Sequence, residues 1–108
     1  MVTLKQIQKE VEQRYFEKRD SVFVAMCLAG EVGEVCNWIK KFCRVENGSM
    51  VDGKTREQIR EEIKKELPDI IFYVAKLAND GGYDLEILWK EKMEINDKKY
   101  GDTIGRRR

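Results

Sequence analysis

The sequence predicts an all-α, four-helix bundle-like fold in a single domain spanning residues 1–108. Apolar residues recur at helical spacing in four segments, and no segment alternates polar and apolar residues as a half-buried strand would. A charged content of 38%, well above the usual quarter, and a single proline are also typical of a well-solvated helical protein. A chain of this length can bury one modest core.

The four helices are predicted from apolar stripes and from their start and stop signals. The first covers about residues 3–18 and has one apolar face, formed by Leu4, Ile7, Val11 and Tyr15. The second begins at an Asp20 or Ser21 cap and runs to about residue 43. The third begins at the capping box Thr55-Arg-Glu-Gln58 and runs to about residue 79, before Gly81-Gly82.

The remaining segments are a loop, a fourth helix and a tail. Asn47-Gly48 and Asp52-Gly53 are two turn signals, so residues 44–54 are expected to form a polar loop or a very short hairpin. The fourth helix is predicted from an Asp84 cap to about Tyr100, and the basic tail at about residues 102–108 is expected to fray.

Composition excludes several kinds of chemistry and several partners. The chain has no histidine, which excludes histidine-based catalytic triads, histidine-containing zinc sites and the Glu-x-x-His pairs of di-iron bundles. Its 21 basic and 20 acidic residues nearly balance, so neither nucleic acid nor a membrane is an expected partner. Three cysteines without a CxxC pair predict reduced, buried thiols. With no signal peptide and no long apolar run, a cytoplasmic protein is expected.

Each of the two long central helices carries a carboxylate in its apolar stripe. Glu31 completes the stripe of the second helix, and Glu66 completes that of the third. Each is followed three residues later by another acid, Glu34 or Asp69, about 60° away around the helix. Because an unpaired buried carboxylate is costly, the resulting patch of four acids is expected to have cationic partners.

Lysine or a divalent metal could neutralise this patch. Lys40, Lys64 and Lys65 are near in sequence, but they lie off the stripes that carry the acids. Four clustered carboxylates without nitrogen or sulfur ligands favour a hard ion, Mg²⁺ or Mn²⁺. Mg²⁺ held by carboxylates usually keeps positions for phosphate oxygens and water, which points to phosphoryl chemistry. Pro68, inside the third helix, predicts a kink at residues 64–68.

Two further features could bind a nucleotide. Lys92, Asn96 and Lys99 form a polar stripe on the fourth helix. Taken alone they are ordinary solvated residues, but opposite a metal site they could hold the outer phosphates of a polyphosphate. Trp38 lies one turn past Glu34 and could stack on a base, although its place in the apolar stripe favours core packing.

Three segments in this order resemble the MazG-like, all-α NTP pyrophosphohydrolases, and most of all their short, dCTPase-like branch. The segments are GEVGEV at residues 30–35, KELPDIIFYVAKLA at residues 65–78 and KMEINDKKYG at residues 92–101. The resemblance implies a homodimer or homotetramer that uses Mg²⁺ to split a nucleoside triphosphate into the monophosphate and pyrophosphate, as in the house-cleaning of non-standard nucleotides. Two positions depart from the family pattern: Pro68 stands where the family usually has glycine, and Gly30 where many relatives have glutamate.

The resemblance also implies roles for individual residues. The metal ligands would be Glu31, Glu34, Glu66 and Asp69, with Glu34 as the general base. The phosphate contacts would be Lys92, Asn96, Lys99 and Tyr100. Two alternatives remain: a dUTPase-like or phosphoribosyl-ATP pyrophosphohydrolase on the same scaffold, and a non-catalytic helical interaction module with solvated acids.

Overall fold

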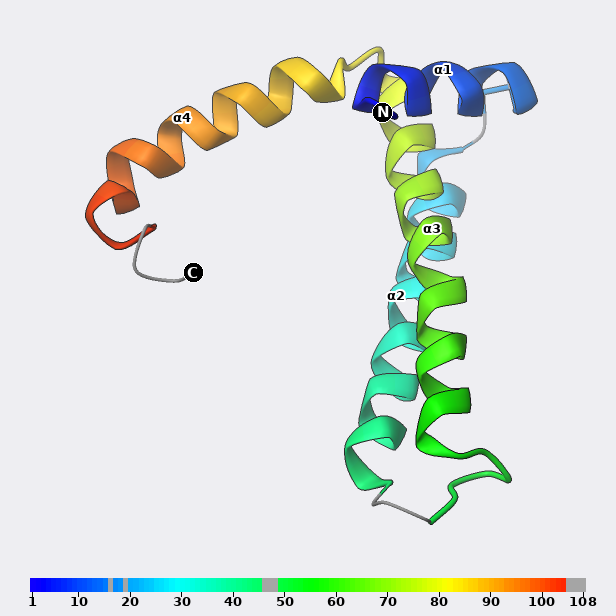
Figure 1. The fold of residues 1–108 in the computed structure, drawn as a ribbon. Helices are drawn as coiled ribbons and strands as arrows, with labels where there is room; N and C mark the ends of the chain where they lie inside the picture. Colours follow the sequence, from blue (N-terminus) through cyan, green and yellow to red (C-terminus); the bar gives the residue numbers. More distant parts are fainter. Residues whose placement is uncertain (16, 19, 46–48, 105–108) are drawn as a thin grey trace.

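The computed structural model describes residues 1–15, 17, 18, 20–45 and 49–104, and these form four α-helices, as predicted. The helices are α1 (Leu4–Arg14), α2 (Ser21–Arg44), α3 (Arg56–Gly81) and α4 (Leu85–Ile104). Helices α2 and α3 form a long antiparallel hairpin, and α1 lies across the end of α3 (Figure 1). Helix α4 projects away from the hairpin (Figure 1).

The helix starts follow the predicted caps. The Thr55 hydroxyl accepts from the Gln58 amide at 3.2 Å, and the Gln58 side chain accepts from the Thr55 amide at 2.8 Å, which completes the capping box of α3. Asp20 accepts from the Val22 amide at 2.8 Å and begins α2. Asp84 does the same for α4, accepting from the Glu86 amide at 2.9 Å.

The predicted end of the first helix was wrong. Helix α1 ends at Arg14 rather than near residue 18, and Tyr15 follows in a non-helical conformation. The Lys76 ammonium on α3 donates to the carbonyl oxygens of Tyr15 at 3.1 Å and of Glu17 at 2.7 Å. These carbonyls are therefore bound to a distant lysine instead of continuing the hydrogen bonds of α1.

The connection between α2 and α3 contains the short hairpin that the turn signals predict. Val51 and Lys54 exchange two backbone hydrogen bonds of 3.0 Å, and Asp52 and Gly53 between them have φ values of 53° and 72°. Two successive positive φ values are the conformation that an Asp-Gly hairpin turn adopts. The Asn47-Gly48 signal and the last four tail residues lie outside the described residues.

The buried core is small and lies along the α2–α3 hairpin and under α1. Its apolar members are Val11, Val24, Val35, Val45, Ile59, Ala75 and Ala78. Cys36 and Cys43 are exposed and Cys27 is half-buried, so the prediction of buried thiols was wrong for two of the three cysteines. Helix α3 continues unbroken through Pro68.

Much apolar surface stays uncovered in the single chain. The radius of gyration is 17.6 Å, whereas a compact domain of 108 residues has about 13 Å. Met26 on α2 and Trp89 on α4 are 70% and 59% exposed.

Helix α2 is long and apolar enough to cross a membrane. Core helices of soluble proteins pass the same test, and α2 carries Glu31 and Glu34 near its middle.

Candidate metal centre

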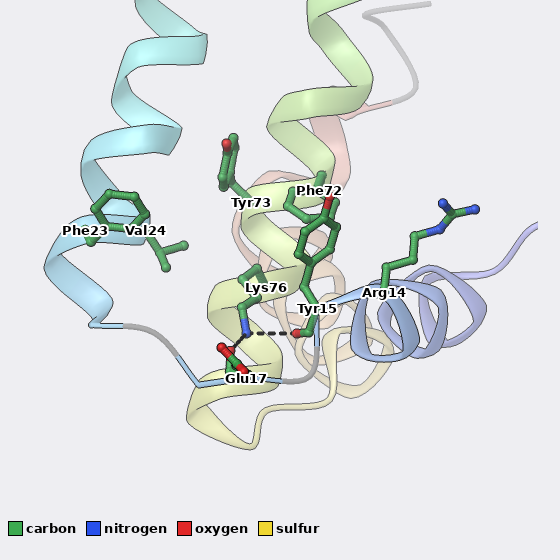
Figure 2. Close-up of a pocket in the computed structure, with 8 residues that line it drawn as sticks. All are labelled: Arg14, Tyr15, Glu17, Phe23, Val24, Phe72, Tyr73 and Lys76. Atoms are coloured by element: carbon green, nitrogen blue, oxygen red, sulfur yellow. Dashed lines mark hydrogen bonds between the residues drawn. The ribbon is translucent and has the colours of Figure 1, made fainter.

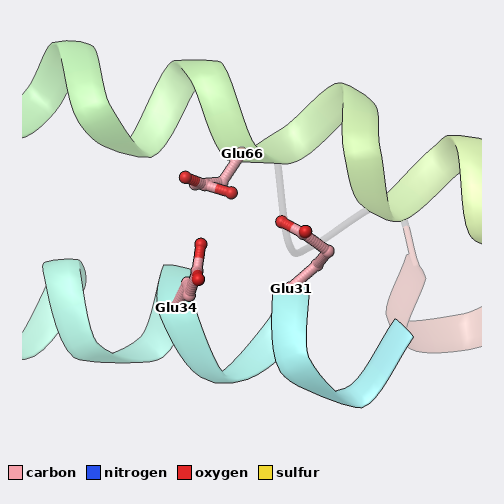
Figure 3. A group of neighbouring side chains, drawn as sticks. All are labelled: Glu31, Glu34 and Glu66. Carbon is pink, nitrogen blue, oxygen red and sulfur yellow. The ribbon is translucent and has the colours of Figure 1, made fainter. Parts of the chain in front are cut away.

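Three carboxylates from the two long helices meet in the middle of the hairpin. Glu31 and Glu34 project from α2, and Glu66 faces them from α3 (Figure 3). Each offers one oxygen that lies within 4.8 Å of the oxygens of the other two. The spacing explains this convergence: Glu31 and Glu66 occupy stripe positions of helices that pack together, and Glu34 lies one turn after Glu31, so folding the hairpin brings the three to one place.

The acids repel one another, which changes their pKa values. The charge of Glu66 is the main cause that raises the pKa of Glu34, followed by a hydrogen bond between the two carboxyls. The pKa of Glu66 is raised first by a hydrogen bond with Glu31, then by burial and by the charge of Glu31. Both shifts express the cost of holding several carboxylates together without a cation.

Lysine does not neutralise this group. Among the described residues, no ion pair involves Glu31, Glu34 or Glu66. The lysines that lie nearest Glu66 in sequence, Lys64 and Lys65, instead pair with other acids of α3, at 3.0 Å and 3.4 Å. Oxygen Oε2 of Glu31 is buried and has no hydrogen-bond partner.

The residues present fit a hard divalent cation. The donors are carboxylate oxygens alone, which are the ligands that Mg²⁺ and Mn²⁺ prefer. Soft metals prefer sulfur ligands instead. The unpartnered buried oxygen of Glu31 is also the kind of group that a bound cation would satisfy. Glu31, Glu34 and Glu66 would hold such an ion.

Asp69 lies next to this group but is not one of the three. It is exposed, one turn after Glu66 on α3, and its charge helps to raise the pKa values of both Glu34 and Glu66. Three of the four acids expected as ligands are therefore brought together, and the fourth stands at their edge.

The other expected site residues are not members of the carboxylate group. Trp38 is half-buried on α2, and the Lys41 ammonium lies 4.7 Å from its ring centroid. The predicted phosphate contacts are all on α4, which leaves the hairpin rather than facing the acids (Figure 1); they are Lys92, Asn96, Lys99 and Tyr100. A single chain therefore does not bring the four α4 side chains to the carboxylates.

Sequence reasoning missed one neighbour of the site, Tyr73. Burial is the main cause that raises the pKa of its phenol, followed by the nearby Cys27 and by the charge of Glu31. Its spacing was a usable signal: Tyr73 is seven residues after Glu66, so both lie on the same face of α3.

Comparison with known proteins identifies the family. Residues 20–100 match the model of the MazG nucleotide pyrophosphohydrolase domain. The chain belongs to the MazG family. The match contains all four expected acids as well as the polar stripe of α4, and it confirms the resemblance found in the three sequence segments.

A relative of this MazG chain is the gene 37 protein of Mycobacterium phage L5. The two are 40% identical over 57 residues, which are 53% of this chain and 46% of the phage protein. The chain thus matches about half the length of that relative.

Proposed function

We propose that this MazG protein is a Mg²⁺-dependent nucleoside triphosphate pyrophosphohydrolase that converts a (d)NTP and water into the (d)NMP and pyrophosphate. The proposal depends on one observation: the carboxylates of Glu31, Glu34 and Glu66 lie together within a MazG domain. One oxygen of this group, Oε2 of Glu31, is buried and has no hydrogen-bond partner. A cytoplasmic role in removing non-standard nucleotides would suit this activity.

The chain's own residues would divide the work at this site. When bound, Mg²⁺ would supply positive charge to the phosphate oxygens and make a bound water more acidic. Glu31 and Glu66 would hold the ion from opposite helices, with Asp69 at the edge of the group. Glu34 is the exposed member of the three, whereas Glu31 and Glu66 are half-buried, so it is the proposed general base.

The proposed reaction is an in-line displacement at the α-phosphorus. The water oxygen forms a bond to the α-phosphorus while the bond from that phosphorus to the oxygen bridging it to the β-phosphorus breaks. Pyrophosphate leaves with the bonding electron pair, and Glu34 takes the proton of the attacking water.

A homodimer or homotetramer would complete the site. Helix α4 leaves its own hairpin and exposes Ile87, Leu88 and Trp89, by 54%, 44% and 59%. Packing of α4 against a second copy would bury this surface, and it would let Lys92 and Lys99 reach phosphates bound at a neighbouring carboxylate group. We expect light scattering after size exclusion to give a mass of two or four chains of 12.7 kDa. A monomer at micromolar concentration would contradict this assembly.

The activity is tested by following hydrolysis of canonical and modified (d)NTPs with Mg²⁺ and identifying the products. We expect monophosphate and pyrophosphate, and loss of turnover by at least a hundredfold in Glu34→Gln. Glu61→Gln is the matched control, because Glu61 is an exposed acid of α3 that pairs with Lys64 at 3.0 Å, outside the group. Diphosphate and phosphate as products, or equal turnover in Glu34→Gln, would refute the proposal.

A further inference from the structure

Helix α2 has a second apolar stripe, beside the one that it buries against α3. The members of this outer stripe alternate three and four residues apart along the whole helix; they are Val22, Ala25, Ala29, Val32, Cys36, Ile39 and Cys43. All of them are exposed in the single chain, Val22 by 66%, Val32 by 41% and Ile39 by 45%. Alternation of three and four is the spacing by which one helix packs lengthwise against another.

The outer stripe is prepared for a close neighbour that the chain itself does not supply. It carries no charged residue along about 32 Å of helix, because Glu31 and Glu34 point to the carboxylate group instead. Gly33 lies beside the stripe, and a Cβ atom built there would meet nothing within 4 Å. Glycine in a helix costs about 1 kcal/mol relative to alanine, and no group of the same chain requires it here. The close approach of another backbone would account for it.

The sizes of the stripe residues suit an antiparallel second copy of the same helix. If a two-fold axis passes at Val32, this residue faces its own copy. Ala29 then faces Cys36 of the second copy. One turn farther out, Ala25 faces Ile39 of the second copy in the same way. Each small residue meets a larger one, which fills the space between the helices. A parallel pair would instead set alanine against alanine and leave gaps in the N-terminal half.

The charges at the two ends of α2 favour the same direction. Asp20 caps the start of the helix, whereas Lys40 and Arg44 lie near its end. Antiparallel pairing brings these two cations to the acidic, N-terminal end of the second α2, and it also opposes the two helix dipoles favourably. In a parallel pair the cations of one copy would lie beside the same cations of the other.

We propose that two copies of this chain associate through the outer stripe, with their α2 helices antiparallel about a two-fold axis at Val32. The same surface is used on both copies, as in most symmetric dimers. This surface is separate from the exposed residues of α4, and the pairing does not depend on the proposed reaction. If α4 also binds a second copy, two different self-pairing surfaces on one chain build a tetramer.

The first test reads the direction of pairing by disulfide formation in the full-length protein with oxidised glutathione. The Cys36 residues of an antiparallel pair are about 12 Å apart along the helices, which is beyond the reach of a disulfide. We therefore expect Val32→Cys to form a linked dimer rapidly, and the unchanged protein not to link through Cys36. Asn37→Cys is the matched control, because Asn37 is exposed on α2 but lies outside the stripe. No link in Val32→Cys, or rapid linkage of the unchanged protein through Cys36, would overturn the inference.

The second test breaks the pairing with a charge. Val32→Glu sets two carboxylates against each other at the axis, and we expect it to weaken association at least a hundredfold, so that light scattering gives half the mass of the unchanged protein. Val32 is exposed in the single chain, so the helical circular dichroism should be kept. Asn37→Glu should keep the full mass. An unchanged mass in Val32→Glu, or a monomeric unchanged protein, would overturn the inference. Neither test measures turnover, so a protein that pairs in this way and hydrolyses nothing would refute the proposed function alone.

Discussion

Replacing Lys76 with methionine should destabilise this protein far more than removing any surface lysine. The side chains of Lys76 and Asp80 are only 6% and 7% exposed, and the two are joined at 2.8 Å. Methionine keeps most of the volume of the lysine stem but removes the charge and all three donors. The substitution therefore leaves the Asp80 carboxylate buried and unpaired, and leaves the Tyr15 and Glu17 carbonyls without their partner.

Removing one partner of a buried ion pair typically costs about 3–5 kcal/mol. For a domain of 108 residues the entropy of unfolding is about 0.23 kcal/mol per kelvin, so this loss corresponds to a fall in Tm of about 13–22 °C. Lys64→Met is the matched control on the same helix. Its ion pair with Glu61 is 3.0 Å long but its side chain is 60% exposed, so a loss of at most about 1 kcal/mol, or about 4 °C, is expected.

Thermal and urea unfolding followed by circular dichroism measure both variants. A double variant, Lys76→Met with Asp80→Leu, removes the orphaned charge and should recover at least half of the loss. If Lys76→Met lowers Tm by no more than Lys64→Met does, the buried pair does not hold the α1–α2 segment against α3, and the reasoning is refuted.

Three further outcomes are expected. Mg²⁺ at a hundredfold excess over its Kd should stabilise the protein by about 2.7 kcal/mol, an effect that Glu31→Gln should largely remove and Glu61→Gln should keep in the same thermal scan. Without metal, the raised pKa values of Glu34 and Glu66 mean that the folded chain binds protons that the unfolded chain has lost. The free energy of unfolding should therefore fall as the pH rises from about 4.5 through the raised pKa values of the two carboxyls. The fall should be steeper in the unmodified protein than in Glu66→Gln. Urea midpoints with the same dependence on pH in both proteins would contradict this. Thr55→Ala should lower Tm by about 4 °C through loss of about 1 kcal/mol of capping, and Thr55→Ser should lower it less.

Helix positions could be predicted from the sequence because their causes are local. Thr55 and Gln58 complete a capping box within four residues of chain, and Asp20 and Asp84 cap their helices in the same local way. The end of α1 could not be predicted, because the lysine that binds the Tyr15 and Glu17 carbonyls, just beyond that end, is about sixty residues away.

The carboxylate group could also be predicted, and for a related reason. Glu31 and Glu66 lie in the apolar stripes near the middle of two consecutive helices, so packing the stripes together in an antiparallel hairpin brings the acids together. The pocket where α2, α3 and the end of α1 meet (Figure 2) was not predicted, because its lining residues come from parts of the chain that are far apart in sequence. The placement of Lys92 and Lys99 does not follow from periodicity either, since α4 is exposed on several sides in the single chain.

The most direct test of the proposed chemistry is hydrolysis of a (d)NTP in H₂¹⁸O with Mg²⁺, with mass spectrometry of both products. Attack by water at the α-phosphorus places one ¹⁸O atom in the monophosphate and none in the pyrophosphate, and this is the expected result. Label in the pyrophosphate would mean attack at the β-phosphorus, and no hydrolysis of any (d)NTP would mean that the three carboxylates do not serve this reaction; either result would contradict the proposed function.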